Sequence, residues 1–153
     1  APRRAAARGA RARRGARQPR ALPYRLYRST GGIEILVGRG ATSNDTLTFK
    51  VASPGDVWLH ARGASGAHVL LRWTRDEPPP GRDLEEAAML AAWHSKARGS
   101  SVVPVDWTRR KYVRRPRGGA PGLVMVTRSE TLMVRPDDEI ERSLRARATE
   151  PRA

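Results

Sequence analysis

The sequence contains no cysteine, and this absence excludes disulfide bonds and thiolate metal sites. It has no apolar run approaching the roughly 20 residues that a membrane helix needs, and it lacks the apolar core of a secretory signal. Lysine is scarce, with three residues among the 30 basic ones, so the choice of arginine at one position carries little information. These absences favour a cytoplasmic protein without a membrane partner.

The charge of the chain is strongly positive and unevenly distributed. The 153 residues carry 30 Lys and Arg against 15 Asp and Glu, which gives a net charge of +15. Residues 1–20 hold eight arginines and no acid, and the rest of the chain keeps a net charge of +7. A balance of this size favours an anionic partner such as nucleic acid or an acidic surface.

Composition divides the chain into three parts. Residues 1–22 are rich in Ala, Arg and Gly and contain too little apolar surface to offset their ordering entropy, so we expect a disordered arm. Residues 23–138 have regular hydrophobic patterns and predict one folded domain. Residues 139–153 predict a charged C-terminal tail with a short helix.

Two hairpins are predicted by alternating apolar and polar residues. Residues 24–29 and 33–38 flank a glycine turn, and residues 56–62 and 67–73 flank a second one. In the second hairpin Trp58 lies on the polar face, together with the neighbouring histidines and arginines.

Helical spacing predicts one main helix and a short extra one. The main helix covers residues 83–98, with Asp83 as its cap and basic residues in its last turn, and the short helix covers residues 42–51, with Ser43 or Asn44 as its cap. Three more strands are expected at 102–108, 122–128 and 130–136, and Pro104 predicts an edge position for the first. The expected fold class is α+β, an antiparallel β-sheet with one main packed helix, a short extra helix and basic loops at one rim.

A basic segment runs from Trp107 to Gly122. Its cations are Arg109, Arg110, Lys111, Arg114, Arg115 and Arg117, and Trp107 and Tyr112 lie among them. Arginine and lysine neutralise phosphates, and aromatic faces stack on exposed bases. The segment favours nucleic acid as the partner, with RNA before DNA.

The polar face of the second hairpin predicts an exposed aromatic and cationic surface. Trp58, His60 and Arg62 lie side by side on one strand, and His68 lies on the next. Base stacking, docking on another protein and packing beneath the basic segment all remain open as uses for this surface.

The histidines are the natural candidates for chemistry. His60 and His68 flank a turn and can approach one another, but no HxxxH, HExxH or Ser-His-Asp pattern accompanies them. We therefore predict no catalytic residue, no metal, no cofactor and no enzymatic activity for this domain.

Several motifs resemble a known family. DVWLHARGASGAHVLL, the helix end SKAR, VDWT, KYVRRP and the following PG resemble the NFACT-R domain, the RNA-binding module of the NEMF/RqcH ribosome-quality-control family. Trp107 and Gly119 stand where the family often has Tyr and Ala. The resemblance implies an RNA-binding part of factors that bind the large ribosomal subunit and recruit tRNA. The other domains of those factors have no counterpart in this sequence, so their tailing activity is not implied.

The basic segment and the resemblance together predict the site. The residues expected to bind RNA are Trp58, His60, Arg62, His68, Lys96, Arg98, Trp107, Thr108, Arg109, Lys111, Arg114, Arg115 and Arg117. The residues expected to hold the shape are Asp56, Gly66, Ala97, Asp106, Pro116 and Gly122.

The function predicted from the sequence is that of an RNA-binding module. We expect it to contact ribosomal RNA or tRNA in ribosome-associated quality control of stalled translation, with the large ribosomal subunit as its partner. The alternatives are a protein-docking module on the ribosome and, with less support, a metal-dependent nuclease or hydrolase. The patterns leave the oligomeric state open.

Overall fold

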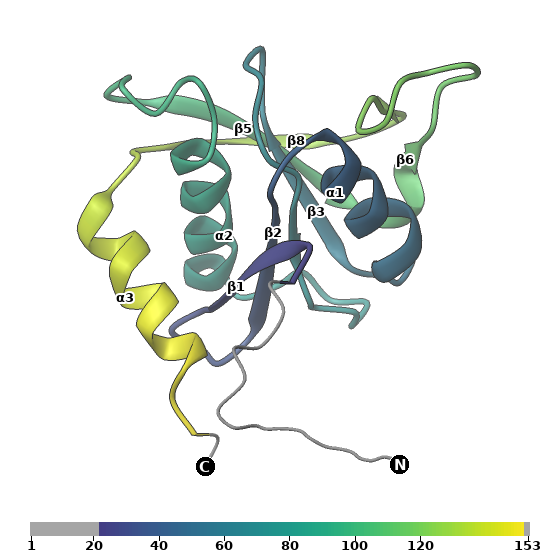
Figure 1. Ribbon diagram of the computed structural model, residues 1–153. Helices are drawn as coiled ribbons and strands as arrows, with labels where there is room; N and C mark the ends of the chain where they lie inside the picture. Colours follow the sequence, from purple (N-terminus) through teal and green to yellow (C-terminus); the bar gives the residue numbers. More distant parts are fainter. Residues whose placement is uncertain (1–21, 152–153) are drawn as a thin grey trace, which may run out of the picture.

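The computed structural model describes residues 22–151, which form an α+β fold (Figure 1). The expected disordered arm therefore lies outside the described residues, apart from Leu22. In chain order the elements are β1 (Tyr24–Arg28), β2 (Glu34–Gly38), α1 (Ala41–Thr46), η1 (Leu47–Val51), β3 (Val57–Ala61), β4 (Val69–Leu71), α2 (Gly81–Trp93), β5 (Val103–Arg109), η2 (Arg110–Tyr112), β6 (Val113–Arg114), β7 (Met125–Val126), β8 (Glu130–Val134) and α3 (Asp138–Ala148). This arrangement confirms the predicted fold class.

Six strands form one antiparallel sheet in the order β1-β2-β4-β3-β5-β8. Both predicted hairpins are present, because β1 pairs with β2 and β3 pairs with β4. The register places Trp58 opposite Leu70 on one side and opposite Thr108 on the other. Strands β6 and β7 form a separate two-stranded ribbon, so much of the strand expected at 122–128 is loop.

The edge position predicted for Pro104 is wrong, because β5 lies between β3 and β8. Strand β3 ends with Ala61 opposite Val105, so Pro104 lies one residue beyond the regular pairing. Its carbonyl still accepts a hydrogen bond from the N–H of Arg62 at 2.9 Å. The β3–β5 pairing therefore lacks only one hydrogen bond, the one that a backbone N–H at position 104 would donate to Arg62.

Helices α2 and α3 cover the first face of the sheet (Figure 1). The buried side of α2 consists largely of small residues, which let the helix lie close to the strands: Ala87, Ala88, Ala91 and Ala92. Alternate residues of the strands, such as Val57 and Leu59, complete this core. Leu144 attaches α3 to the same core and is fully buried.

A buried hydroxyl joins α3 to the end of α2. Tyr27 Oη donates to Glu141 Oε2 at 2.7 Å and lies 2.8 Å from His94 Nε2. Burial and the hydrogen bond to Glu141 raise the pKa of Tyr27, so the phenol stays protonated. Because its single hydrogen goes to Glu141, the ring of His94 is the donor to Tyr27.

The second face of the sheet is covered by α1, η1 and the β6–β7 ribbon. Its core consists of Leu36, Leu47, Trp58, Leu70 and Val113, all of them buried. The alternation predicted for β3 is correct, but the face that we expected to be exposed is the floor of this second core.

The main helix begins at Gly81 and ends at Trp93, so the prediction that it reaches residue 98 is wrong. Asp83 is not its cap, because the Asp83 carboxylate accepts a hydrogen bond from the N–H of Gly31 at 2.8 Å. The Ser95 hydroxyl bonds the carbonyl of Ala92 and accepts from the N–H of Ala97, which closes a turn directly after the helix. Lys96 and the residues after it therefore lie on a turn at the end of the helix.

The short helix predicted at 42–51 is confirmed, but its start differs from the prediction. The helix begins after Gly40, and the Ser43 hydroxyl accepts hydrogen bonds from the N–H groups of Arg39 and Gly40 at 2.6 and 2.9 Å. Its second half, η1, has the wider turns of a π-helix. No helix among residues 22–151 is both long enough and apolar enough to cross a bilayer.

Candidate nucleic-acid interface

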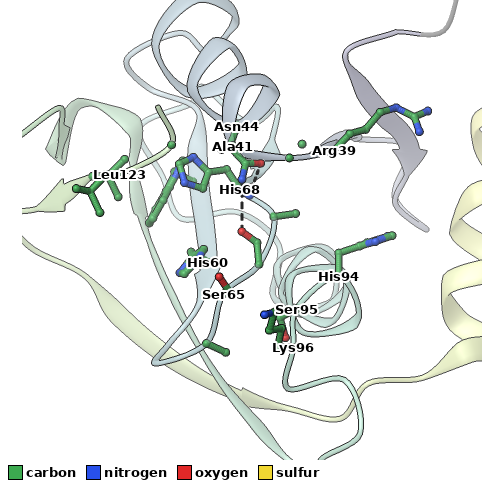
Figure 2. Close-up of a pocket in the computed structure, with 18 of the residues that line it drawn as sticks. Arg39, Ala41, Asn44, His60, Ser65, His68, His94, Ser95, Lys96 and Leu123 are labelled. Atoms are coloured by element: carbon green, nitrogen blue, oxygen red, sulfur yellow. Dashed lines mark hydrogen bonds between the residues drawn. The ribbon is translucent and has the colours of Figure 1, made fainter. Parts of the chain in front are cut away.

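A groove of about 1070 Å³ opens where four loops meet (Figure 2). Its walls are the segment that leads into α1 (38–44), the β3–β4 turn (63–68), the turn after α2 (94–98) and the end of the basic segment (120–124). Figure 1 shows the β3–β4 turn and the loop after β6 at the same end of the sheet. The fold therefore brings together motifs that lie far apart in the sequence.

The β3–β4 turn and the turn after α2 contact each other directly. Gly66 and Ser95 form an isolated β-bridge, and the N–H of Lys96 donates to the carbonyl of Ser65 at 2.9 Å. A Cβ atom on Gly66 would lie 2.8 Å from Cβ of Ser95, so this approach needs glycine. Ala97, in the same turn, packs against the first core.

Four exposed cations surround the groove: Arg25, Arg39, Lys96 and Arg98. Within residues 22–151, none of the four forms an ion pair with a carboxylate. Arg98 lies 4.3 Å from the centre of the Trp93 ring, which fixes its stem while its charge remains at the surface. Burial and then the charges of Arg25 and Arg98 lower the pKa of His94 to about 4, so the ring is neutral at pH 7 and adds no charge to the groove.

Only one ring of the predicted aromatic surface is substantially accessible from the groove. Trp58 is 2% exposed and His68 is 3% exposed, so the prediction that they form an exposed surface is wrong. His60 is half-buried and lies parallel to Trp58, with ring centres 6.0 Å apart, and its own centre is 5.8 Å from that of His68. The two histidines therefore approach one another as expected, but only His60 is positioned to meet a ligand.

A chain of hydrogen bonds explains why His68 is buried. Trp58 Nε1–H donates to Thr48 Oγ1 at 3.1 Å, and that oxygen lies 2.7 Å from His68 Nδ1. An indole N–H can only donate, so the Thr48 oxygen accepts from Trp58, and its second lone pair or its own hydrogen completes the bond to His68 Nδ1. Burial and then the charge of His60 lower the pKa of His68 to about 4, and an interaction with the Gly122 backbone opposes this shift.

Asp45 holds both ends of the basic loop 115–122. Its carboxylate accepts two hydrogen bonds from Arg115 Nη1, at 2.9 and 2.8 Å, and a third from the N–H of Gly122 at 3.3 Å. Burial acts to raise the pKa of Asp45, but these bonds lower it. Gly122 has φ of 83°, and a Cβ there would lie 3.0 Å from the carbonyl oxygen of Ala41. The loop is therefore fixed to α1, and the charge of Arg115 is paired.

Several other cations of the predicted site have intramolecular partners. The Arg109 guanidinium donates to the carbonyls of Gly55 and Trp73, and also to those of Asp76 and Glu77. These bonds brace the loop between β4 and α2.

Arg62 is also engaged. It pairs with Asp106 at 2.9 Å and donates to Thr131 at 2.6 Å. Arg110 donates to the carbonyl of Thr48 and lies over the Phe49 ring. These bonds turn both arginines toward the protein itself.

Lys111, Arg114 and Arg117 are exposed and, within residues 22–151, form no ion pair with a carboxylate. Arg114 and Arg117 belong to the basic segment whose end forms one wall of the groove, whereas Lys111 lines a second hollow. The structure thus divides the predicted site into paired cations that brace loops and unpaired cations that face solvent.

Part of the predicted site lies away from the groove. Trp107, Thr108, Arg109 and Lys111 line a second hollow of about 580 Å³. Trp107 packs against the first core, and Thr108 is buried. The groove receives these residues from the predicted list: Trp58, His60, His68, Lys96, Arg98, Gly66, Asp106 and Gly122.

The remaining residues of the predicted list have roles in loop geometry. Asp56 is fully buried, accepts from the N–H of Ser53 at 2.8 Å and lies 3.3 Å from Arg72 Nε. Burial raises the pKa of Asp56. Pro116 accepts a hydrogen bond from the N–H of Gly119 within the basic loop.

Sequence reasoning missed part of the groove. Arg25 and Arg39 contribute two of its cations, and Asn44 positions the turn through hydrogen bonds with the N–H of His68 at 3.0 Å and the carbonyl of Gly66 at 3.4 Å. A Cβ on Gly38 would lie 1.9 Å from Asn44 Oδ1, so this close approach is built into β2. In the sequence, the one local sign of this contact is Gly38 at the end of β2, where a residue with a side chain would collide with Asn44.

No group of three or more His, Cys, Asp or Glu side chains suited to hold a metal ion occurs among residues 22–151. His68 is buried and its Nδ1 is occupied by Thr48 Oγ1 at 2.7 Å, so His60 is the histidine of this pair with an accessible ring. The donor set around the paired histidines therefore does not fit a metal site.

Comparisons with known proteins agree with the sequence motifs. A family model described as "NFACT protein RNA binding domain" matches residues 23–127. The chain is 42% identical over 111 residues to "Rqc2 homolog RqcH" of Bacillus subtilis, which is 72% of this chain and 19% of that protein. It is 29% identical over 73 residues to "Ribosome quality control complex subunit NEMF" of Homo sapiens, covering 48% of this chain and 7% of that one.

A solved structure has a similar fold. It is the C-terminal part of the fibronectin/fibrinogen-binding protein from Streptococcus suis, which matches with a TM-score of 0.76 and 37% identity over 84% of this chain and 51% of that chain. The chain spans about a fifth of the length of the RqcH proteins that it matches.

Proposed function

We propose, because this chain belongs to the family of the NFACT protein RNA binding domain, that its groove and the adjoining basic loop are the surface that binds RNA. The homologous proteins are ribosome quality control factors. Membership of this family supports RNA as the ligand, and the positions of the exposed cations support the groove as the binding surface.

One observation carries this proposal: none of the four cations around the groove forms an ion pair with a carboxylate among residues 22–151, although Arg39 and Arg98 each donate a hydrogen bond to a backbone carbonyl. Elsewhere Arg62, Arg72 and Arg115 are paired with carboxylates, whereas Lys96 and Arg39 point their charge to solvent beside a concave surface. Uncompensated like charges gathered at one place repel each other, and a polyanion relieves that repulsion. Arg114 and Arg117 extend the same field along the basic loop.

We further propose that the bound RNA is ribosomal RNA or tRNA, on the large ribosomal subunit in the cytoplasm, and that the domain binds without catalysis. The names of the homologues support a place in ribosome quality control. Because the chain covers about a fifth of the RqcH proteins, activities of their other domains are not assigned to it.

The docking alternative loses its original argument, since it began from an exposed Trp58 that is in fact buried. The nuclease alternative loses its ligands, because His68 is engaged by Thr48.

Affinity for a structured RNA, measured at several salt concentrations, tests the proposed surface. Lys96→Ala should weaken binding and lower the slope of log affinity against log salt by roughly 0.7 to 0.9, because one phosphate contact is lost. Lys50→Ala is the matched control, because Lys50 is also exposed and unpaired but lies in η1, away from the groove. Equal losses for the two variants would place the RNA elsewhere, and a wild-type protein that binds no RNA at low salt would refute the proposal entirely.

A further inference from the structure

We propose that the groove seats one unpaired base of RNA against the face of His60, with the adjoining phosphates held by cations on the groove walls. This inference rests on the proposed RNA-binding function and names the form of RNA that the groove accepts. The occupant is a nucleotide turned out of a helix, such as a bulge or a loop residue, and not the side of a continuous duplex.

The first argument is a ring stack that ends in the groove. Trp58 and His60 are parallel, with an interplanar angle of 16° and ring centres 6.0 Å apart, as expected for residues two apart on one face of a strand. Trp58 is the buried end of this stack, and His60 is its half-buried end. An added aromatic ring on the outer face of His60 would continue an arrangement that the protein has already built.

The second argument is that the next side chain on this face of β3 is drawn away from the stack. Arg62 follows His60 by two residues, but its guanidinium is held by Asp106 at 2.9 Å and by Thr131 at 2.6 Å. Those partners belong to β5 and β8, so Arg62 extends sideways across the sheet. No hydrogen bond holds the ring of His60 among residues 22–151; its neighbours are the rings of Trp58 and His68 and the charge of Asp106, which lies opposite it in β5.

The third argument is the shape and size of the groove. Its volume of about 1070 Å³ is slightly above the roughly 300 to 1,000 Å³ that small-molecule pockets occupy, which leaves room for one base and its adjoining phosphates. Duplex RNA is convex and keeps its bases stacked inside, so it cannot place a base on His60. Unpaired bases can be turned out, stacked on aromatic or histidine rings and enclosed in such pockets.

The fourth argument is that cations lie on separate walls around His60. Arg39 belongs to the segment before α1, and Lys96 belongs to the turn after α2 (Figure 2). A nucleotide turned out of a chain carries a phosphate on each side, so a ring between separated cations suits it. A lone phosphate would need one compact cluster of donors, with no ring at its centre.

The test uses the full 153-residue chain and two RNAs with the same number of phosphates. One is a continuous duplex, and the other is a duplex with a single bulged 2-aminopurine whose fluorescence falls on stacking. The wild type should bind the bulged RNA about tenfold more tightly than the duplex and quench its fluorescence, because stacking on one ring strengthens binding by roughly this factor.

Replacement of the ring separates stacking from charge. His60→Ala should lose about tenfold in affinity for the bulged RNA and abolish the quenching, while binding to the duplex changes less than twofold. His60→Phe should restore both signals, since it keeps a ring in the same place and removes no hydrogen bond. This rescue also separates loss of stacking from loss of folding.

The outcomes distinguish this inference from the proposed function. If the wild type binds both RNAs equally with no quenching, or if His60→Phe behaves like His60→Ala, the base-seating inference fails while RNA binding stands. If adenosine monophosphate alone competes with the bulged RNA at equal concentration, the occupant is a free nucleotide and the inference is also overturned. If the wild type binds neither RNA, the proposed function fails first.

Discussion

The two faces of the central sheet are built on different physical principles. The first face, under α2 and α3, has the larger apolar core, with small alanines against Val57, Leu59 and their neighbours. Its buried Asp83 and Glu141 bond to the β1–β2 hairpin. The second face has a smaller apolar core and a set of buried polar groups, Thr48 and His68 among them, that bond to each other and to loops. The comparison teaches that packing on one face defines the scaffold, whereas hydrogen bonds on the other place the loops of the groove.

The largest effect should come from the first face. Leu90→Ala removes a fully buried side chain from α2 and should lower the free energy of unfolding by about 2 to 5 kcal/mol. Denaturant titration measures this loss, and Ile140→Ala on the exposed side of α3 serves as its control. A loss as small as that of the control would mean that this core does not determine stability.

A substitution on the second face should lower the free energy of unfolding by less, but it should also weaken RNA binding in the groove. Thr48→Val keeps the shape of the side chain but leaves the Trp58 indole N–H and His68 Nδ1 without partners, which should cost about 1 to 3 kcal/mol. RNA affinity of the folded protein should also fall, because His68, which interacts with the Gly122 backbone of the basic loop, loses its Thr48 partner. Thr42→Val, at an exposed position of α1, is the matched control. If both variants were equally stable, the hydrogen-bond chain would have no structural role.

The free energy of unfolding should depend on pH because of the buried His68 on the second face. The pKa of His68 is lowered to about 4 from the ordinary 6.5, so the unfolded chain binds a proton that the folded protein does not. Stability should therefore be complete above pH 6.5 and should fall as pH drops toward 4, by roughly 1 kcal/mol per unit for this group. His94, whose pKa is also lowered to about 4, acts in the same direction. Chemical unfolding of the wild type and His68→Gln between pH 4 and 8 measures the share of His68.

The smallest stability effect should come from the exposed loop, where the binding effect is expected instead. Arg114→Ala with Arg117→Ala should change unfolding by less than about 0.5 kcal/mol, because both side chains are exposed and unpaired. RNA affinity should fall, and the salt slope should drop by roughly 1.4 to 1.8. Arg115 is left in place, because it holds Asp45. Unchanged affinity and slope would remove the loop from the RNA surface.

Much of the fold could be predicted from the sequence, because its signals are local. Glycine turns between alternating segments predicted both hairpins, and the alanine-rich segment predicted α2. The burial of Trp58 could not be read from alternation, which says which residues share a face but not whether another layer covers it. Leu70, paired opposite Trp58 on the same face, was the available sign that this face is covered.

The candidate site was predictable in part. The motif residues of the β3–β4 turn and of the turn after α2 do meet in one groove. Arg25 and Arg39 escaped prediction because their place depends on which strand lies beside which. The hydrogen bonds of Arg109 escaped it because the accepting carbonyls belong to a loop more than 30 residues away in the sequence. A count of arginines therefore cannot separate cations that face a ligand from cations that brace loops.

The Tyr27 hydroxyl has a mechanical consequence. One oxygen atom bonds both Glu141 of α3 and His94 at the groove wall, and Leu144 fixes α3 to the same sheet. A displacement of α3 would therefore act on the groove wall through this one oxygen, in addition to the apolar packing that Leu144 provides.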